Sequence, residues 1–282
     1  MRRHPDWLKV KVAGGENFVK MKKLLRDARL HTICEEAKCP NIAECFGNGT
    51  AVFLILGDVC TRDCRYCNVK HGEPLVLNPD EPHDVAVSVK QLGLKYVVIT
   101  SVTRDDLIDG GASVFYETVR EIRNLNSGCK IEVLIPDFKG DVDALKRVLN
   151  SKPDVVNHNI EVTEELFPVI RPQGDYRTSL SVLKSIKKID NSARSKSGFM
   201  IGIGENKDQI VRTMEDLRKM DVDFLTIGQY LQPTIGHAEI KKYYTPKEFN
   251  EFKQIGLDLG FSHVESGPLV RSSYHAEKSI IQ

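Results

Sequence analysis

Six apolar, β-branched segments recur from residue 51 onwards, and a stretch with helical periodicity separates each from the next. The segments are AVFLIL (51–56), KYVVIT (95–100), KIEVLI (130–135), DVVNHNI (154–160), GFMIGI (198–203) and DFLTIG (223–228). Apolar runs that alternate with helices predict parallel strands joined by right-handed crossovers. We therefore expect an α/β fold, namely a partial (β/α)6 parallel barrel, since eight such units would be needed to close a complete one.

The helical stretches lie at about 82–93, 113–126, 141–150, 176–189, 207–220 and 245–260. The last begins with a capping signature. Thr245 is a suitable N-cap, Pro246 suits the first helical position, and Glu248 completes a capping box.

The net charge and the hydropathy pattern argue against two classes of protein. The formal charge is +1, from 40 Lys+Arg and 39 Asp+Glu, whereas a general nucleic-acid binder would show a basic excess. No apolar stretch approaches the roughly 20 residues of a membrane span, and the N-terminus lacks the apolar run of a signal peptide. We expect a soluble cytoplasmic protein with no nucleic-acid or membrane partner.

Six of the seven cysteines form two groups of three. The first triad is Cys34, Cys39 and Cys45 (C-x4-C-x5-C), and the second triad is Cys60, Cys64 and Cys67 (C-x3-C-x2-C). Each triad is one ligand short of a closed tetrahedral zinc site or a fully cysteine-bound cluster. A four-iron cluster on three cysteines keeps one iron free to bind another molecule, which points to chemistry rather than to scaffolding.

Other uses of these cysteines fit less well. Disulfides would need an oxidising compartment. A zinc ribbon would show two C-x2-C pairs, and only Cys64 and Cys67 have that spacing. Metal binding by both triads is therefore predicted, with an iron–sulfur cluster favoured over zinc. Cys129 stands alone near a strand start and is expected to be a packed thiol.

Polar residues follow all six predicted strands, where active sites of parallel α/β folds lie. In chain order they are Asp58, Thr100, Ser101, Arg104, Asp105, Asp106, Asp109, Asp137, Asn157, His158, Asn159, Glu161, Gly202, Gly204, Glu205, Gln229, Tyr230 and Gln232. Taken singly, His158 could be a satisfied core histidine, and Asp105 and Asp106 could cap a helix. Together these residues predict one polar mouth.

Residues 1–50 are expected to form an N-terminal extension, residues 51–260 the barrel, and residues 261–282 a C-terminal extension. The segment FVKMKKLLRDARLHTI predicts a helix with an apolar inner face. Its other face carries Lys20, Lys22, Lys23 and Arg26. This basic face is either a solvated helix surface or a docking site for an acidic partner.

The motif Cys60-Thr-Arg-Asp-Cys64-Arg-Tyr66-Cys67, placed after the first strand of a partial barrel, resembles the radical SAM superfamily. The preceding C-x4-C-x5-C narrows the resemblance to the lipoyl synthase family, over nearly the whole chain. Supporting segments are EEAKCPNIAEC, TSVTRDDLIDGGA, NHNIE, IRPQGDYRTSLSVL, IGIGE, GQYLQPT and VRSSYHA. Phe46 and Tyr66 stand where Trp and Phe are more usual, and both keep an aromatic ring.

The resemblance implies a partial barrel of the radical SAM type, with S-adenosylmethionine and two 4Fe–4S clusters as cofactors. Cys60, Cys64 and Cys67 would hold the cluster whose open iron chelates S-adenosylmethionine. An electron from this cluster would cleave S-adenosylmethionine to methionine and a 5′-deoxyadenosyl radical. Further contacts to S-adenosylmethionine are implied for Tyr66, Thr100, Asn159 and Glu205.

The resemblance also implies an auxiliary 4Fe–4S cluster on Cys34, Cys39 and Cys45. Its fourth ligand would be the serine of the R-S-S-Y motif that maps to Ser273, with Ser272 as the alternative. A serine oxygen is harder than a thiolate and should leave iron more readily. The auxiliary cluster could then be dismantled as a source of sulfur. Ser273, together with Cys60, Cys64 and Cys67, would then be a catalytic residue.

The implied activity is that of a sulfurtransferase, which inserts two sulfur atoms at C6 and C8 of an octanoyl chain carried on a protein lysine. This would be the second step of lipoate biosynthesis from octanoyl-acyl carrier protein. Implied partners are octanoylated lipoyl carrier domains (2-oxoacid dehydrogenase E2 subunits and the glycine cleavage H protein), a reduced ferredoxin or flavodoxin as electron donor, and iron–sulfur assembly proteins.

Three alternatives stay open at this point. The first is a sulfur-inserting radical SAM enzyme that acts on a free small molecule, in the manner of biotin synthase. The second is an electron carrier or cluster scaffold without turnover, and the third is a zinc-binding interaction module.

Overall fold

The computed structural model describes residues 5–10, 14–28, 30–47, 51–274 and 276. Their main element is an eight-stranded sheet in the order β1-β2-β5-β6-β7-β8-β9-β10. Its strands are β1 (His31–Thr32), β2 (Val52–Ile55), β5 (Tyr96–Ser101), β6 (Lys130–Leu134), β7 (Val155–Asn157), β8 (Arg194–Ile201), β9 (Phe224–Gln229) and β10 (His263–Gly267). A separate pair is formed by β3 (Val59–Cys60) and β4 (Lys70–His71).

The six predicted strands form the centre of this sheet, and every neighbouring pair among them is parallel. The α/β fold of parallel strands is thus confirmed. Two strands of this sheet were not predicted: β1 adds antiparallel to β2, and β10 adds parallel to β9. The separate pair of β3 and β4 was not predicted either. β1 has only two residues, and the segment HVESG of β10 lacks an apolar run, so neither gave a strand signal.

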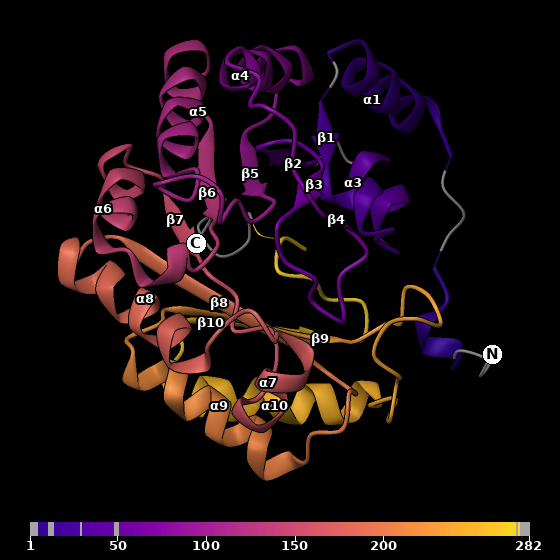
Figure 1. Cartoon of the computed structure of the whole chain (residues 1–282). Coiled ribbons are helices and arrows are strands. Elements are labelled where there is room, and N and C mark those ends of the chain that lie inside the picture. The colour runs from indigo at the N-terminus through magenta and orange to yellow at the C-terminus, as the bar shows by residue number, and fades with distance from the viewer. Residues whose placement is uncertain (1–4, 11–13, 29, 48–50, 275, 277–282) are drawn as a thin grey trace.

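The helices enclose the sheet in an arc (Figure 1). The six predicted helices correspond to α4 (Glu81–Leu92), α5 (Ala112–Leu125), α6 (Val142–Asn150), α8 (Tyr176–Ile189), α9 (Lys207–Lys219) and α10 (Pro246–Asp258). The capping box at α10 is confirmed, because Thr245 Oγ1 accepts from the Glu248 N–H while the Glu248 carboxylate accepts from the Thr245 N–H. In the described part of the chain, no helix combines the length and apolar character that crossing a bilayer requires.

The N-terminal helices lie at the open side of the arc (Figure 1). They are α1 (Glu16–Asp27), α2 (Ile33–Glu36) and α3 (Ile42–Gly47). As the apolar periodicity predicted, α1 buries Met21 and Leu25. Most of its basic face is exposed, but Lys22 lies 3.2 Å from the Glu35 carboxylate and so belongs partly to the contact between α1 and α2.

The remaining short elements lie in the loops. They are the 3-10 turns η1 (Asp6–Leu8), η2 (Phe138–Gly140) and η3 (Glu164–Leu166), and the helix α7 (Phe167–Ile170).

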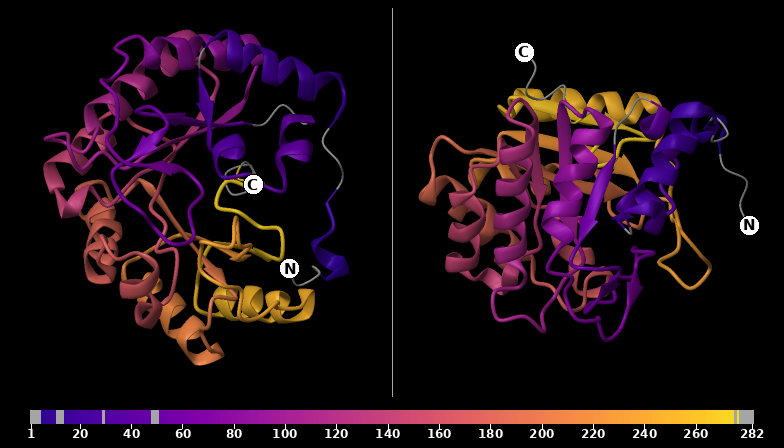
Figure 2. Two further views of the ribbon diagram at one scale, coloured as in Figure 1. Left: turned by 45° about the vertical axis from the view of Figure 1, so that its right-hand side comes forward. Right: turned by 90° about the horizontal axis from the view of Figure 1, so that it is seen from above.

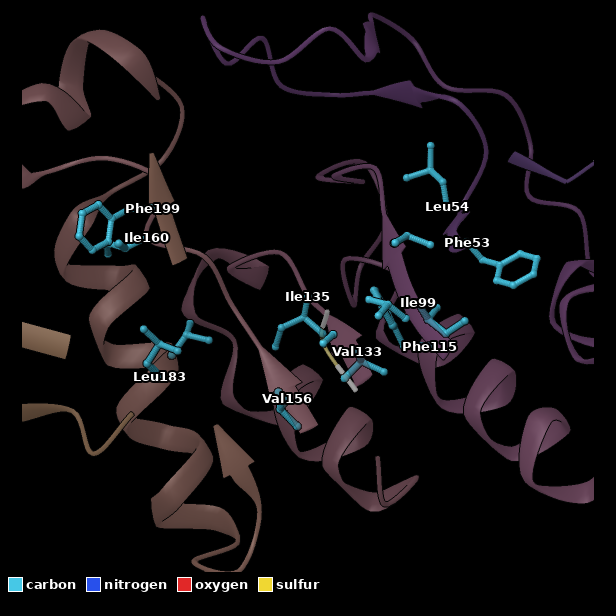
Figure 3. Packing of buried hydrophobic residues seen from close by; sticks show 14 of the residues in the cluster. Phe53, Leu54, Ile99, Phe115, Val133, Ile135, Val156, Ile160, Leu183 and Phe199 are labelled. Carbon is cyan, nitrogen blue, oxygen red and sulfur yellow. The ribbon is translucent and has the colours of Figure 1, made fainter. Parts of the chain in front are cut away.

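Apolar side chains of the strands pack against one another and against the helices (Figure 3). Phe115 of α5 and Leu183 of α8 are both fully buried in this layer. Burial of such side chains contributes about 25 cal/mol per Å² of apolar surface. The side of the sheet that faces the helices is therefore stabilised by apolar packing. The opposite side can carry polar groups.

One buried ion pair lies among these strands. Lys196 Nζ of β8 lies 3.0 Å from Glu132 Oε1 of β6, and the two side chains are 3% and 0% exposed. Glu132 also accepts hydrogen bonds from Tyr96 Oη at 2.7 Å and Asn157 Nδ2 at 2.9 Å. Each oxygen of the carboxylate is therefore hydrogen-bonded, which offsets the cost of burying this pair.

Replacing Lys196 by Met should lower the free energy of unfolding by about 3–5 kcal/mol, since Glu132 then remains buried without its cation. The urea dependence of unfolding measures this change. The matched control is Lys146→Met, which removes an exposed partner of Asp143 and should change stability by less than about 1 kcal/mol. Equal losses in the two variants would contradict the prediction.

Candidate active site

A cavity of about 490 Å³ lies at the carboxyl ends of the parallel strands. The lining includes all six cysteines of the two triads and the predicted site residues Tyr66, Thr100, Asn159 and Ser273. Polar residues that follow the second, fourth and sixth predicted strands line it as well, namely Ser101, His158, Glu161, Gln229, Tyr230 and Gln232. The cavity thus combines the two triads with the polar mouth in one space.

Glu205 does not line this cavity, so the cavity gives no support to the contact with S-adenosylmethionine that we predicted for it. Its Oε1 accepts from the Gly202 N–H at 2.6 Å, and its Oε2 accepts from the N–H groups of Ile203 and Gly204 at 3.0 and 3.1 Å. Both oxygens of the carboxylate thus accept hydrogen bonds from the backbone of their own loop. Gly202 and Gly204 have φ values of +111° and +137°, which glycine adopts readily, and Glu205 holds that turn closed.

The second triad lies on the loop after β2. Cys60 Sγ accepts backbone hydrogen bonds from the N–H groups of Arg62 at 3.4 Å and Thr103 at 3.3 Å. Burial raises the pKa of the Cys67 thiol to about 12 and also raises the pKa of Cys64, against the opposing charge of Arg171. These sulfurs would therefore need a metal partner to be held as thiolates.

Arg62, between Cys60 and Cys64, fixes this loop to the barrel. Its Nε and Nη2 donate to the two oxygens of Asp105 at 2.7 and 2.9 Å, and its Nη1 and Nη2 donate to those of Asp137 at 2.6 and 2.8 Å. Burial opposes the ionisation of Asp137, but Arg62 outweighs it and lowers the pKa of Asp137 to about 2. Asp105 and Asp137 follow β5 and β6, so the guanidinium ties the loop to two strand ends.

Backbone contacts hold the other side of the same loop. His237 Nε2 donates to the carbonyl of Cys67 at 2.9 Å, and the Ala238 N–H donates to the carbonyl of Arg65 at 2.8 Å. Asn68 Nδ2 donates to the carbonyl of Glu36 at 2.8 Å, which connects the second cysteine loop to the first. The relative position of the two triads is thus set by direct hydrogen bonding.

The first triad lies against the C-terminal segment. Asn41 Nδ2, between Cys39 and Cys45, donates to the carbonyl of Leu269 at 2.7 Å, and Tyr274 Oη donates to Glu44 at 3.2 Å. The two segments lie side by side in both views of Figure 2. Residues more than 220 positions apart are therefore neighbours, and Ser273 lines the same cavity as the first triad.

Burial also dominates the electrostatics of the first triad. It raises the pKa of Cys34 to about 12, with the neighbouring Cys39 adding to the effect. The pKa of Cys39 is raised by burial too, and the charge of Arg271 opposes this shift. The R-S-S-Y motif thus brings a guanidinium as well as Ser273 to the first triad.

A glycine lets the C-terminal segment come this close. A Cβ on Gly228 of β9 would lie 2.2 Å from the carbonyl oxygen of Val270. Real Cβ atoms do not approach backbone that closely, so any other residue would displace the segment that carries Ser273.

Several buried polar atoms in the cavity wall have no hydrogen-bond partner among the described residues. They are Ser101 Oγ, His158 Nε2, Asn159 Oδ1 and Arg171 Nε. A buried polar group without a partner is costly, so such a cluster in one cavity fits a polar ligand. S-adenosylmethionine, with its hydroxyl, amino and carboxylate groups, meets this requirement.

Two further side chains complete this wall. Tyr66 hydrogen-bonds to the carboxylate of Glu161, and burial raises the pKa of both groups. Glu161 has a φ of +72°, a strained value for a residue other than glycine. Arg171 lies over the ring of Phe167 and donates to the carbonyl of Asn159 at 3.3 Å.

The cysteines do not converge on a point. Among the described residues, no three His, Cys, Asp or Glu side chains come close enough to hold a single metal ion. A four-iron cluster takes each cysteine on a different iron and so occupies more space than one ion.

Sequence reasoning missed Arg62, Arg171 and Asn68 as functional neighbours of the cysteines. Arg62 and Asn68 are adjacent to triad cysteines, which was a usable signal. Arg171 lies more than 100 residues from Cys64, and only the fold brings them together.

Comparison with known proteins places this site in a class. Residues 54–217 match the model of the radical SAM superfamily. SuiB of Streptococcus suis, solved with S-adenosylmethionine, has the same fold with a TM-score of 0.59 at 13% identity, covering 89% of this chain and 61% of that one. The chain is therefore a member of the radical SAM superfamily, as the second triad predicted.

Residues 1–39 match the model of the N-terminal domain of lipoyl synthase. The lipoyl synthase of Rubrobacter xylanophilus is 56% identical over 274 residues, which cover 97% of this chain and 85% of that protein. The lipoyl synthase of Caldicellulosiruptor bescii is 52% identical over 282 residues, covering 99% and 97%. This chain belongs to the lipoyl synthase family, which confirms the resemblance and removes the scaffold and zinc-module alternatives.

Replacing Arg62 by Met should loosen the second cysteine loop, because Asp105 and Asp137 would be left without their cation. We expect a loss of about 3–5 kcal/mol in unfolding free energy and a lower iron content after anaerobic reconstitution. The control is Arg212→Met, which removes an exposed ion pair with Glu165 and should leave both quantities nearly unchanged. Full iron content in the Arg62→Met protein would show that the loop holds without this contact.

Proposed function

We propose that this chain inserts sulfur at C6 and C8 of an octanoyl chain linked to a lysine of a lipoyl carrier protein. The observation that carries the proposal is that both cysteine triads and Ser273 line one cavity. Lipoyl synthases of this family are radical SAM enzymes with S-adenosylmethionine and 4Fe–4S clusters as cofactors.

The second triad is the proposed ligand set of the cluster that binds S-adenosylmethionine. In this assignment Tyr66, Thr100 and Asn159 contact S-adenosylmethionine, while Glu205 supports its loop. The unpartnered atoms of Asn159 and Arg171 support it, because they provide an acceptor and a donor in the same wall. Thr100 Oγ1 is directed by its hydrogen bond to the carbonyl of Leu134 at 3.0 Å.

The first triad is the proposed ligand set of the auxiliary cluster, with Ser273 as its fourth ligand. When bound, the cluster on the second triad and S-adenosylmethionine would supply a 5′-deoxyadenosyl radical, and the auxiliary cluster on the first triad would supply sulfur. Cys34 is buried, whereas Cys39, Cys45 and Ser273 are all partly exposed. The harder oxygen of Ser273, rather than its exposure, supports Ser273 as the ligand that can leave.

The partners follow from this reaction. Family membership supports a lipoyl carrier protein as the substrate. The E2 subunits and the H protein are the proposed carriers, and we propose a ferredoxin or flavodoxin as the electron donor and iron–sulfur assembly proteins for rebuilding the auxiliary cluster. The reducing cytoplasm is the proposed location, because cysteine triads that hold clusters need a compartment in which disulfides do not form.

The exposed basic residues of α1, Lys20, Lys23 and Arg26, are one proposed contact for an acidic carrier. Opposite charge would speed the encounter and would be screened by salt.

The first test compares wild type with the variant Cys34→Ala/Cys39→Ala/Cys45→Ala after anaerobic reconstitution. Iron should fall from about eight to about four per chain. 5′-Deoxyadenosine should still form, because the second triad is intact, while the lipoyl product on an octanoyl-lysyl peptide should be lost. The matched control is Cys129→Ala, a buried thiol outside both triads, which should keep all three readouts.

Two results would contradict the proposal. Wild type with about four irons would mean that only one triad holds a cluster. A triad variant that still makes lipoyl product would mean that the first triad is structural.

A second test separates the two serines of the R-S-S-Y motif. Ser273→Ala should abolish lipoyl product while keeping 5′-deoxyadenosine formation, because only the auxiliary cluster loses a ligand. Ser272→Ala, one position away on the same turn, should retain activity. The opposite pattern would transfer the ligand role to Ser272.

A further inference from the structure

His158 is a buried group that the proposed function leaves without a role. It directly follows β7, its side chain lines the cavity, and the residue is only 1% exposed. The ring is held at one nitrogen and unpaired at the other, which is unusual for a buried histidine.

One hydrogen bond of the His158 ring defines which of its nitrogens carries the proton. Nδ1 lies 2.9 Å from the carbonyl oxygen of Ile135, and a carbonyl oxygen can only accept. Nδ1 must therefore carry the hydrogen, which makes Nε2 of the neutral ring an acceptor. Within the described residues, Nε2 is buried and has no partner.

The surroundings keep the ring neutral. Burial lowers the pKa of His158 to about 4, and the positive charge of Arg171 adds to this effect. At neutral pH the imidazole is thus an acceptor fixed in orientation, in a wall that also contains the apolar side chains of Leu134 and Ile135.

We propose that Nε2 of His158 accepts a hydrogen bond from an N–H or O–H donor of a molecule bound in the cavity. This rests on the proposed function, which supplies two sources of such a donor. One is a hydroxyl or amino group of S-adenosylmethionine, and the other is the amide N–H that joins the octanoyl chain to its lysine.

The buried acceptor gives selectivity as well as affinity. A ligand without a donor at this point leaves the buried Nε2 unpaired, and sites built in this way discriminate against such ligands. If the donor is the amide N–H, His158 distinguishes an acyl chain on a lysine from the same chain in an ester or thioester.

The test measures binding to the anaerobically reconstituted holoenzyme without turnover. The ligands are S-adenosylmethionine, an octanoyl-lysyl peptide, and the same peptide with an ester oxygen in place of the amide N–H. His158→Phe and His158→Leu remove the acceptor, whereas His158→Gln can keep one near Nε2. Iron content and melting temperature check that each variant is folded.

We expect His158→Phe or His158→Leu to weaken either S-adenosylmethionine or the amide peptide roughly 2- to 12-fold, with His158→Gln closer to wild type. Weaker binding of S-adenosylmethionine alone identifies the nucleoside as the donor. Weaker binding of the amide peptide alone, with the ester peptide bound equally by wild type and variant, identifies the amide.

Wild-type affinity for both ligands in a folded, iron-containing His158→Phe or His158→Leu protein would overturn the proposal. Loss of iron or of folding in both of these variants would also overturn it, since His158 would then serve the structure alone. Because binding is measured without product formation, a wild-type enzyme that makes no lipoyl product would contradict the proposed function and not this inference.

Discussion

The ion pairs of Arg62 with Asp105 and Asp137 hold the loop of the second triad at the ends of the strands, and the position of the site depends on them. The loop of the second triad carries three partly buried thiols, whose sulfurs repel one another once they are ionised. Asp105 and Asp137 hold the guanidinium in two bidentate hydrogen bonds, a geometry that lysine cannot provide. The second triad is thereby placed at the ends of two neighbouring strands before any cluster binds.

The open side of the sheet affects where the two ends of the chain lie. In a closed barrel the termini would lie outside the strands, whereas here the first triad and the C-terminal segment fill the gap together (Figure 2). Asn41 bonds to Leu269, and Gly228 gives the segment room to pass. The segment of the first triad and the C-terminal segment thus meet, and both triads line one cavity.

The cavity wall contains buried polar atoms that a polar ligand can pair with. Ser101, His158, Asn159 and Arg171 each have a buried polar atom without a partner among the described residues, and such groups are costly to bury. The same groups become satisfied when a polar ligand binds, so part of the folding free energy is recovered as affinity. The apolar contacts between the sheet and its helices, and the fully bonded Glu132–Lys196 pair, provide the stability that makes this arrangement possible.

The sequence by itself determined the six parallel strands, the six outer helices, the capping box at Thr245 and the cysteine motifs, because these signals are local in the chain. It could not show that the Glu205 carboxylate is hydrogen-bonded within its own loop, or that Arg171 lies close enough to Cys64 to act on its pKa. It also could not show which atom of His158 is unpaired. Such facts depend on distances between residues far apart in the sequence, which only the packing of the strands and of the two extensions decides.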